Sequence, residues 1–121
     1  MGCVFCKLDR TVLVQSDLSR AFLDRFPVSE GHALVIPKRH VASIWEITDR
    51  EYADAFSLVR HVKDLLQERF GTQGFNIGVN CGEAAGQTVF HAHIHIIPRY
   101  AGDVPAPRGG VRNVIPGKGN Y

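Results

Sequence analysis

The sequence predicts an α+β fold, in which an antiparallel sheet of about five strands packs against one long helix. Three short β-prone runs, separated by turn residues, come first in the chain. A long segment with apolar residues at helical spacing follows them, and two further alternating runs come after it. A chain of 121 residues can bury one hydrophobic core, so we expect a single domain over residues 1–121.

The three runs before the helix are short and closely spaced. They cover Thr11–Gln15, Arg20–Phe26 and His32–Ile36, and the last two end before Pro27 and Pro37. Short strands joined by tight turns favour antiparallel pairing. We therefore expect these runs to form neighbouring antiparallel strands.

The helix is predicted over Thr48–Phe70. Thr48 and Glu51 have the spacing of a capping box, in which each residue satisfies a free backbone donor at the helix start. Gly71 follows as a C-terminal cap. Apolar residues recur at helical spacing and indicate one buried stripe: Tyr52, Ala55, Phe56, Val59, Val62, Leu66 and Phe70.

The second half of the chain predicts two more strands and a tail. Residues 75–80 alternate as in a strand, and a glycine-containing loop over 81–88 leads to a histidine-rich strand. Three prolines and five glycines after residue 100 disfavour regular structure there. We expect a core over residues 1–100, with a Cys-x-x-Cys motif at its start, and an irregular tail over 101–121.

Composition and charge exclude several classes of protein. A formal net charge of +2 is too small to favour nucleic acid as a partner. No apolar run approaches the ~20 residues that span a bilayer, and no signal peptide is readable at the N-terminus. The three cysteines are an odd number, which argues against a disulfide framework and favours the cytoplasm. We therefore expect a cytoplasmic protein with neither a membrane nor a nucleic acid as its partner.

Three histidines in one stretch carry most of the functional information. His91, His93 and His95 alternate with apolar residues. Because successive side chains of a strand point to opposite faces, we expect the three imidazoles on one face. The core would then receive the residues between and beside them: Phe90, Ala92, Ile94 and Ile96.

Two kinds of chemistry fit such a face. Neighbouring histidines would lie ~6.6 Å apart, so two of them and a third from elsewhere could hold a metal. Alternatively, a neutral imidazole attacks phosphorus while nearby donors hold the phosphate oxygens. The preceding loop favours phosphate, because exposed backbone N–H groups beside Gly82, Gly86, Gln87 and Thr88 would bind an anion. An ordinary β-turn contains the same glycines, so the loop alone does not decide.

The stretch from Gly86 to Ile97 resembles the signature of the histidine-triad (HIT) family, in which three histidines alternate with apolar residues. The segment from Glu30 to His40 and the start Cys3-x-x-Cys6 are also similar to family segments. The resemblance implies a half-barrel-like antiparallel sheet and a homodimer. It also implies a nucleotide hydrolase or transferase.

The resemblance assigns a role to each matching residue. His93 would be the nucleophile that takes the nucleotidyl group, and His95 would hold a phosphate oxygen or the leaving-group side. Gln87 and Thr88 would bind phosphate oxygens, and Asn80 would lie near the phosphate. The free nitrogen of His93 would be selected by a backbone carbonyl that accepts from the other ring nitrogen.

Two further residues receive roles in the same way. Asp24 matches a position that binds ribose hydroxyls, and His32 matches a histidine that supports the triad. From the residues alone, Asp24 and Asn80 are typical of turns at strand ends, and His32 is typical of a core histidine.

The Cys3-x-x-Cys6 motif has three interpretations: a redox pair, two incidental cysteines, or half of a zinc site. A redox pair normally lies where a strand meets a helix, whereas this motif stands at the N-terminus. A resemblance to zinc-bearing members of the superfamily implies His40 and His91 as the other ligands. We therefore predict a closed structural zinc site.

The predicted function is hydrolysis at the α-phosphate of a nucleoside phosphoramidate or dinucleoside polyphosphate, through a covalent nucleotidyl-histidine. The substrate would be a purine nucleotide. Within the family, Gln87-Thr88 slightly favours the branch that acts on dinucleoside polyphosphates over the branch that acts on phosphoramidates. Nucleotidyl transfer to phosphate and a non-catalytic nucleotide-binding module remain alternatives. A small zinc-stabilised nucleic-acid binder is disfavoured by the modest charge. Arg108 and Arg112 in the tail are either solvated or reach a polyphosphate.

Overall fold

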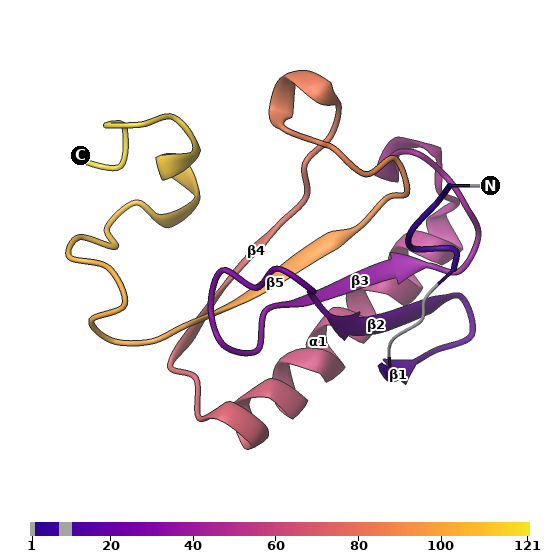
Figure 1. Ribbon diagram of the computed structural model, residues 1–121, viewed down its shortest axis with the longest axis horizontal. Coiled ribbons are helices and arrows are strands. Elements are labelled where there is room, and N and C mark those ends of the chain that lie inside the picture. The colour runs from indigo at the N-terminus through magenta and orange to yellow at the C-terminus, as the bar shows by residue number, and fades with distance from the viewer. Residues whose placement is uncertain (1, 8–10) are drawn as a thin grey trace.

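The computed structural model describes residues 2–7 and 11–121 and contains a five-stranded antiparallel sheet packed against one α-helix (Figure 1). The strands lie side by side in the order β1-β2-β3-β5-β4, which leaves β1 and β4 at the two edges. The predicted α+β class is therefore confirmed. The elements are β1 (Val12–Gln15), β2 (Ser19–Leu23), β3 (Ala33–Pro37), α1 (Asp49–Phe70), β4 (Gly74–Gly78) and β5 (Ile94–Arg99), with single 3₁₀ turns at Ile44–Glu46, Glu83–Ala85 and Gly110–Val114.

The ends of α1 lie where the sequence predicts them. Thr48 accepts from the backbone N–H of Glu51, and Glu51 accepts from that of Thr48, so the capping box is complete. Gly71 ends the helix at a φ of 65°, in the left-handed region that favours glycine. The buried face of the helix is formed by Ala55, Leu58, Val59, Val62 and Leu66.

Two residues of the predicted apolar stripe do not reach the core. Tyr52 is 39% exposed and Phe56 is 38% exposed. Their rings stack on each other, with centroids 5.3 Å apart and an angle of 17° between the planes. The two residues lie at the side of the apolar stripe. Their helical spacing includes them in the predicted stripe, but the sheet does not cover that side of the helix.

The histidine-rich strand begins later than the sequence predicts. β5 starts at Ile94, so His91 and His93 precede it and only His95 lies on the strand. The chain before Ile94 follows the loop after β3, because Ala92 N–H donates to the Val41 carbonyl at 2.7 Å. The expectation of three imidazoles on one strand face is therefore wrong.

The apolar residues of this stretch divide in the same way. Ala92, Ile94 and Ile96 are buried as expected, whereas Phe90 is 48% exposed. Phe90 and Ala92 both precede the strand, so strand alternation places only Ile94 and Ile96 in the core; Ala92 is buried instead in a small apolar cluster with Val41 and Ile44.

Two apolar clusters lie on the sheet. The larger one fills the space between the sheet and α1 and includes Val35, Val62, Leu66 and Ile96. The second contains residues of β2 and β3 together with Phe5, whose ring lies 5.4 Å from that of Phe22. The N-terminal segment is therefore anchored to the sheet through Phe5.

The tail after β5 is mostly irregular, as expected, and contains one 3₁₀ turn at Gly110–Val114. Arg99 and Asp103 form an ion pair at 2.7 Å where the tail leaves the sheet. The 3₁₀ turn then lies beside β4. Among the described residues, no helix is both long and apolar enough to cross a membrane.

Candidate active site and metal centre

His93 is held by a hydrogen bond to the backbone. Its Nδ1 lies 2.8 Å from the carbonyl oxygen of His91. A carbonyl only accepts, so Nδ1 carries the proton and the neutral ring keeps its lone pair on Nε2. The ring of Phe5 stands edge-on to the His93 ring, with centroids 5.1 Å apart. This is the backbone-carbonyl geometry that the family resemblance implies for a nucleophilic histidine.

His95 and His32 form a second oriented pair. The Val28 N–H donates to His32 Nδ1 at 3.1 Å, so the proton of neutral His32 lies on Nε2. His32 Nε2 lies 3.0 Å from His95 Nδ1 and donates to it. Neutral His95 therefore carries its own proton on Nε2 and can donate a hydrogen bond to a ligand.

Burial keeps both of these rings neutral. The pKa of His95 is lowered to about 4 by desolvation and by the neighbouring His93 and His32. Desolvation also lowers the pKa of His32, and the nearby carboxylate of Asp24 offsets part of that effect. At neutral pH the pair therefore acts through its N–H groups, not through positive charge.

The rings of His93 and His95, 5.1 Å apart, lie on the wall of a pocket of about 370 Å³. Asp24, Asn80 and Thr88 line the same pocket. Phe5, Phe26, Leu34 and Val89 give it apolar walls. Such a combination of apolar walls with a few convergent polar groups is typical of a small-molecule site.

Gln87 does not line this pocket. Its side-chain amide is buried and donates to the carbonyls of Ala42 and Val89, while its Oε1 accepts from the Gly82 N–H. Both amide hydrogens are thus used within the protein. The position of Gln87 supports a role in holding the loop 82–89 against the loop after β3, and its expected contact with phosphate is not supported by this geometry.

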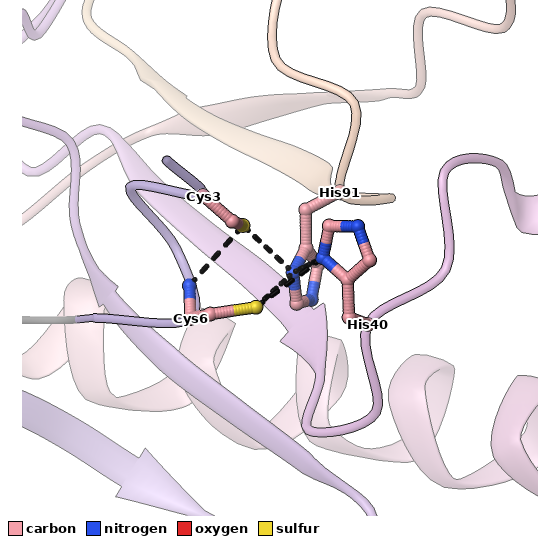
Figure 2. A group of neighbouring side chains, drawn as sticks. All are labelled: Cys3, Cys6, His40 and His91. Atoms are coloured by element: carbon pink, nitrogen blue, oxygen red, sulfur yellow. Dashed lines mark hydrogen bonds between the residues drawn. The ribbon is translucent and has the colours of Figure 1, made fainter. Parts of the chain in front are cut away.

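The side chains of Cys3, Cys6, His40 and His91 converge in a separate cluster (Figure 2). One candidate ligand atom from each residue lies within 4.8 Å of all the others. Cys3 Sγ is 3.4 Å and Cys6 Sγ is 3.5 Å from His91 Nδ1, and Cys6 Sγ is 3.2 Å from His40 Nδ1. The two Nδ1 atoms are 3.3 Å apart.

These distances fit a tetrahedral zinc ion. Zn–S bonds of ~2.3 Å and Zn–N bonds of ~2.0–2.1 Å imply S···N separations of ~3.6 Å and N···N separations of ~3.4 Å. His91 Nε2 donates to the Pro37 carbonyl at 2.8 Å, which leaves Nδ1 unprotonated and turned to the cysteines. Two thiolates and two imidazoles make a closed set with no position for substrate.

His91 joins the two sites. Its ring belongs to the Cys/His cluster, and its backbone carbonyl orients His93. Sequence reasoning missed this link, and it also missed Phe5, which stands between the two cysteines in the chain and contacts the His93 ring. The position of an aromatic residue inside Cys-x-x-Cys is the only signal that could have indicated Phe5.

The comparisons with known proteins agree with this geometry. The family model of the HIT domain matches residues 7–102. The chain belongs to the HIT family. Residues 103–121 lie beyond that match.

Three relatives show the range of similarity. The adenosine 5'-monophosphoramidase hnt1 of Schizosaccharomyces pombe is 42% identical over 104 residues, which cover 82% of this chain and 75% of that protein. The asymmetrical bis(5'-nucleosyl)-tetraphosphatase of the same organism is 42% identical over 92 residues, 76% of this chain and 50% of that protein. A Zn-bound histidine triad family protein from Mycobacterium smegmatis superposes with a TM-score of 0.78 at 33% identity, covering 86% of this chain and 79% of that one.

Proposed function

We propose that this protein is a nucleotidyl hydrolase that cleaves at the α-phosphate of nucleoside phosphoramidates or dinucleoside polyphosphates through a covalent intermediate on His93. The hydrogen bond from His93 Nδ1 to the His91 carbonyl carries the proposal, because it leaves the Nε2 lone pair available on a ring that lines the pocket. Similarity to a monophosphoramidase and to a bis(5'-nucleosyl)-tetraphosphatase supports the substrate class.

The reaction takes two displacement steps. His93 Nε2 attacks the α-phosphorus, a P–N(His) bond forms, and the bond from phosphorus to the leaving group breaks with its electron pair. The leaving atom takes a proton from solvent when it needs one. Water then attacks phosphorus, its proton passes to solvent, and the electron pair of the P–N bond returns to His93. The His95 Nε2–H hydrogen-bonds a phosphate oxygen during both steps.

The other pocket residues bind and orient a purine nucleotide. Asp24 accepts from the ribose hydroxyls, and its place beside apolar Phe26 and Leu34 supports a nucleoside on that side of the pocket. Asn80 and Thr88, both in the connection between β4 and β5, donate to phosphate oxygens. His32 acts through His95 and is a positioning residue.

Replacement of His93 tests the proposed nucleophile. His93→Ala should lower kcat by at least about 10³-fold, because the two-step route needs Nε2, and should leave the Kd for AMP within a few-fold. Wild-type protein incubated with adenylyl-labelled substrate should carry acid-labile label, and the variant should carry none. His61→Ala removes an exposed histidine of α1 and serves as the matched control. Turnover by His93→Ala near the wild-type rate contradicts the proposal.

The same labelled protein separates the alternatives. Discharge of the label by inorganic phosphate, faster than by water, would identify a transferase of the phosphorylase type. Binding of AMP without any label or turnover would identify a non-catalytic nucleotide-binding module.

We further propose that Cys3, Cys6, His40 and His91 hold a structural zinc ion, on the fit described above. When bound, the ion would cross-link the N-terminal segment to the loops that follow β3 and precede β5.

Metal analysis tests the zinc site: it should find about one zinc per chain in the wild type, and Cys6→Ser should lose the zinc. Cys81→Ser, a free cysteine outside the cluster, should keep the zinc. Chelation should lower Tm more than it lowers the chemical rate; zinc-free purified protein with an unchanged Tm would overturn the site.

A homodimer formed through the β4 side is the third part of the proposal. β4 is an edge strand, and its residues Phe75 and Ile77 are only half-buried against the core. The stacked rings of Tyr52 and Phe56 add exposed apolar surface. The cytoplasmic location stays a prediction, consistent with the free cysteines.

A further inference from the structure

Cys3 and Cys6 lie at the two ends of one tight turn (Figure 2). The Cys6 N–H donates to the Cys3 carbonyl at 3.2 Å, which is the hydrogen bond of a β-turn, and it also donates to Cys3 Sγ at 3.3 Å. A β-turn brings the Cα atoms of its end residues within ~7 Å, and disulfides join Cα atoms that are ~4.4–6.8 Å apart. The two Sγ atoms lie within 4.8 Å of each other. The turn therefore already holds this pair of thiols within reach of a disulfide.

Small molecules in solvent can reach this pair of cysteines. Cys6 is exposed and Cys3 is half-buried. Cys3 also lines a surface pocket of about 440 Å³ together with His40 and Phe90. Cysteines in partly exposed positions are the ones that small oxidants attack, whereas buried cysteines are inert. The cluster that we propose as a zinc site therefore has a side that is open to an oxidant.

The same turn carries two residues of the histidine pocket, which is the pocket of about 370 Å³ that His93 and His95 line. Val4 and Phe5 stand between the two cysteines in the chain, and both contribute to the wall of this pocket. The Phe5 ring also stands edge-on to the His93 ring. A change at the two cysteines therefore acts directly on one wall of the histidine pocket.

Oxidation of the pair would remove half of the proposed ligand set. Zinc binds cysteine as the thiolate, and a disulfide has no thiolate to offer. Only His40 and His91 would then remain, and two imidazoles hold zinc more weakly than two thiolates and two imidazoles together. The N-terminal turn would lose its link to His91, whose Nδ1 lies 3.4 Å from Cys3 Sγ and 3.5 Å from Cys6 Sγ.

His93, the proposed nucleophile, would keep its own support in this change. His91 stays attached to the Pro37 carbonyl through Nε2, at 2.8 Å, and its backbone carbonyl still accepts from His93 Nδ1. The orientation of His93 therefore does not depend on the cysteines, whereas the position of Phe5 does. Oxidation should then weaken nucleotide binding and leave the chemical step nearly unchanged.

We propose that Cys3 and Cys6 form a redox-controlled modification site, at which hydrogen peroxide closes a disulfide, displaces the zinc ion and weakens nucleotide binding in the histidine pocket. This inference rests on the proposed zinc site and the proposed hydrolase function, and it adds a control on that function.

The chemistry takes two displacements. The Cys6 thiolate attacks one oxygen of the peroxide, an S–O bond forms while the O–O bond breaks, and hydroxide leaves. The Cys3 thiolate then attacks Cys6 Sγ, the S–S bond forms while the S–O bond breaks, and a second hydroxide leaves. Each sulfur gives one electron to the peroxide, both hydroxides take protons from solvent to form water, and Zn²⁺ passes to solvent. A phosphine reductant returns the two thiolates.

The test treats the zinc-loaded full chain with hydrogen peroxide and follows zinc, the cysteines and binding. A chromogenic chelator should detect about one zinc released per chain, and peptide mass spectrometry should find Cys3 joined to Cys6 with the loss of two hydrogens. The Kd for AMP should rise about tenfold, because ligand binding must then order Phe5, while kcat on adenosine 5'-phosphoramidate should stay within about threefold. A phosphine reductant followed by zinc should restore the original Kd.

Three variants separate the disulfide from other effects of peroxide. Cys81→Ser removes the third cysteine, which lies outside the cluster, and should respond to peroxide as the wild type does. Cys3→Ser cannot form the disulfide, so its Kd for AMP should start near the value of the oxidised wild type and should not change further with peroxide. Phe5→Leu replaces the ring that joins the turn to His93; peroxide should still release its zinc but should change its Kd by less than about twofold.

Each contrary result has a separate meaning. A wild type that forms the disulfide and releases zinc without a change in Kd overturns the link to the histidine pocket. Oxidation confined to Cys81, or to sulfonic acids without a disulfide, overturns the modification site. Purified protein without zinc overturns the zinc site, and reduced protein that neither binds AMP nor cleaves the phosphoramidate overturns the hydrolase function; the inference falls with either.

Discussion

Hydrogen bonds determine which nitrogen of His32, His93 and His95 carries a proton. The His91 carbonyl selects Nδ1–H in His93, and the Val28 N–H selects Nε2–H in His32. His32 in turn selects Nε2–H in His95. One ring therefore presents a lone pair and the other a donor, although the two have the same chemistry in isolation.

His32 can be tested by a pair of variants that differ in whether they donate. His32→Leu removes the donor to His95 Nδ1, so His95 can adopt the other tautomer; we expect kcat to fall about 10- to 100-fold with a smaller change in KM. His32→Gln retains an N–H donor and should recover much of kcat. Steady-state kinetics on the phosphoramidate gives both parameters. Equal kcat in the two variants would show that His32 only fills space.

The N-terminal loop is the element that connects the Cys/His cluster with His93, the proposed nucleophile. Cys3 and Cys6 belong to the cluster, and Phe5 between them is 7% exposed and contacts the rings of both His91 and His93. Phe5 also forms part of the pocket wall. Holding the two cysteines in place therefore also holds one wall of the pocket that His93 and His95 line.

The start of α1 is linked to the loop that carries His40. Arg39 donates to both carboxylate oxygens of Glu51, at 2.7 and 3.1 Å, and this interaction and the capping hydrogen bonds lower the pKa of Glu51 to about 2. Because the folded pKa lies below the ordinary value, the carboxylate stabilises the fold above about pH 4.5, and this contribution is lost as the pH falls toward 2.

Glu51→Gln should therefore lower the free energy of unfolding by about 1–2 kcal/mol at pH 7 through loss of the ion pair with Arg39, because the glutamine side-chain oxygen can still accept the capping hydrogen bond from the Thr48 N–H. The difference from the wild type should shrink at pH 3. Urea unfolding at both pH values measures it. Glu68→Gln, at an exposed position of the same helix, should change stability little at either pH. A Glu51→Gln deficit that is the same at pH 3 as at pH 7 would contradict the assigned role.

Features of the fold that depend on residues close together in the chain are predicted correctly from the sequence, whereas features that depend on distant contacts are not. The caps of α1 depend on Thr48, Glu51 and Gly71, which are neighbours in the chain, and the helix ends were predicted correctly. The start of β5 depends on a contact between Ala92 and Val41, which are distant in the chain, and it was missed. Alternation in the sequence cannot show where a strand loses its partner.

The same distinction applies to the candidate site. The four residues of the Cys/His cluster were named from the family resemblance, and the structure brings them together. The position of Gln87 behind the pocket follows from its contact with the Ala42 carbonyl, which the sequence pattern does not encode. A pocket of about 470 Å³ between residues 110–114 and the sheet depends on how this 3₁₀ turn lies beside β4, and nothing in the composition of the turn indicates it.

At the scale of the whole molecule, the side that carries β4 combines an edge strand with exposed aromatic side chains. Asp54 of α1 bonds Ser16 beside β1, so Tyr52 and Phe56, about half a turn away around the helix, face the β4 side. β4 is the last strand of the sheet, and no other strand among the described residues pairs with its outer edge. In the proposed homodimer, pairing of two β4 edges would join the two sheets and cover both aromatic stacks.

Phe56→Arg tests this surface. Phe56 is partly exposed, so the substitution should leave the fold intact, but two copies would bring two arginines onto the apolar face and the dimer should weaken about 100-fold or more. Light scattering coupled to size-exclusion chromatography should give a dimer for the wild type and a monomer for the variant. Phe26→Arg changes an exposed aromatic residue on the β2–β3 turn and should remain dimeric. A Phe56→Arg variant that is still dimeric would show that the interface lies elsewhere. A wild type that is monomeric would contradict the proposed dimer.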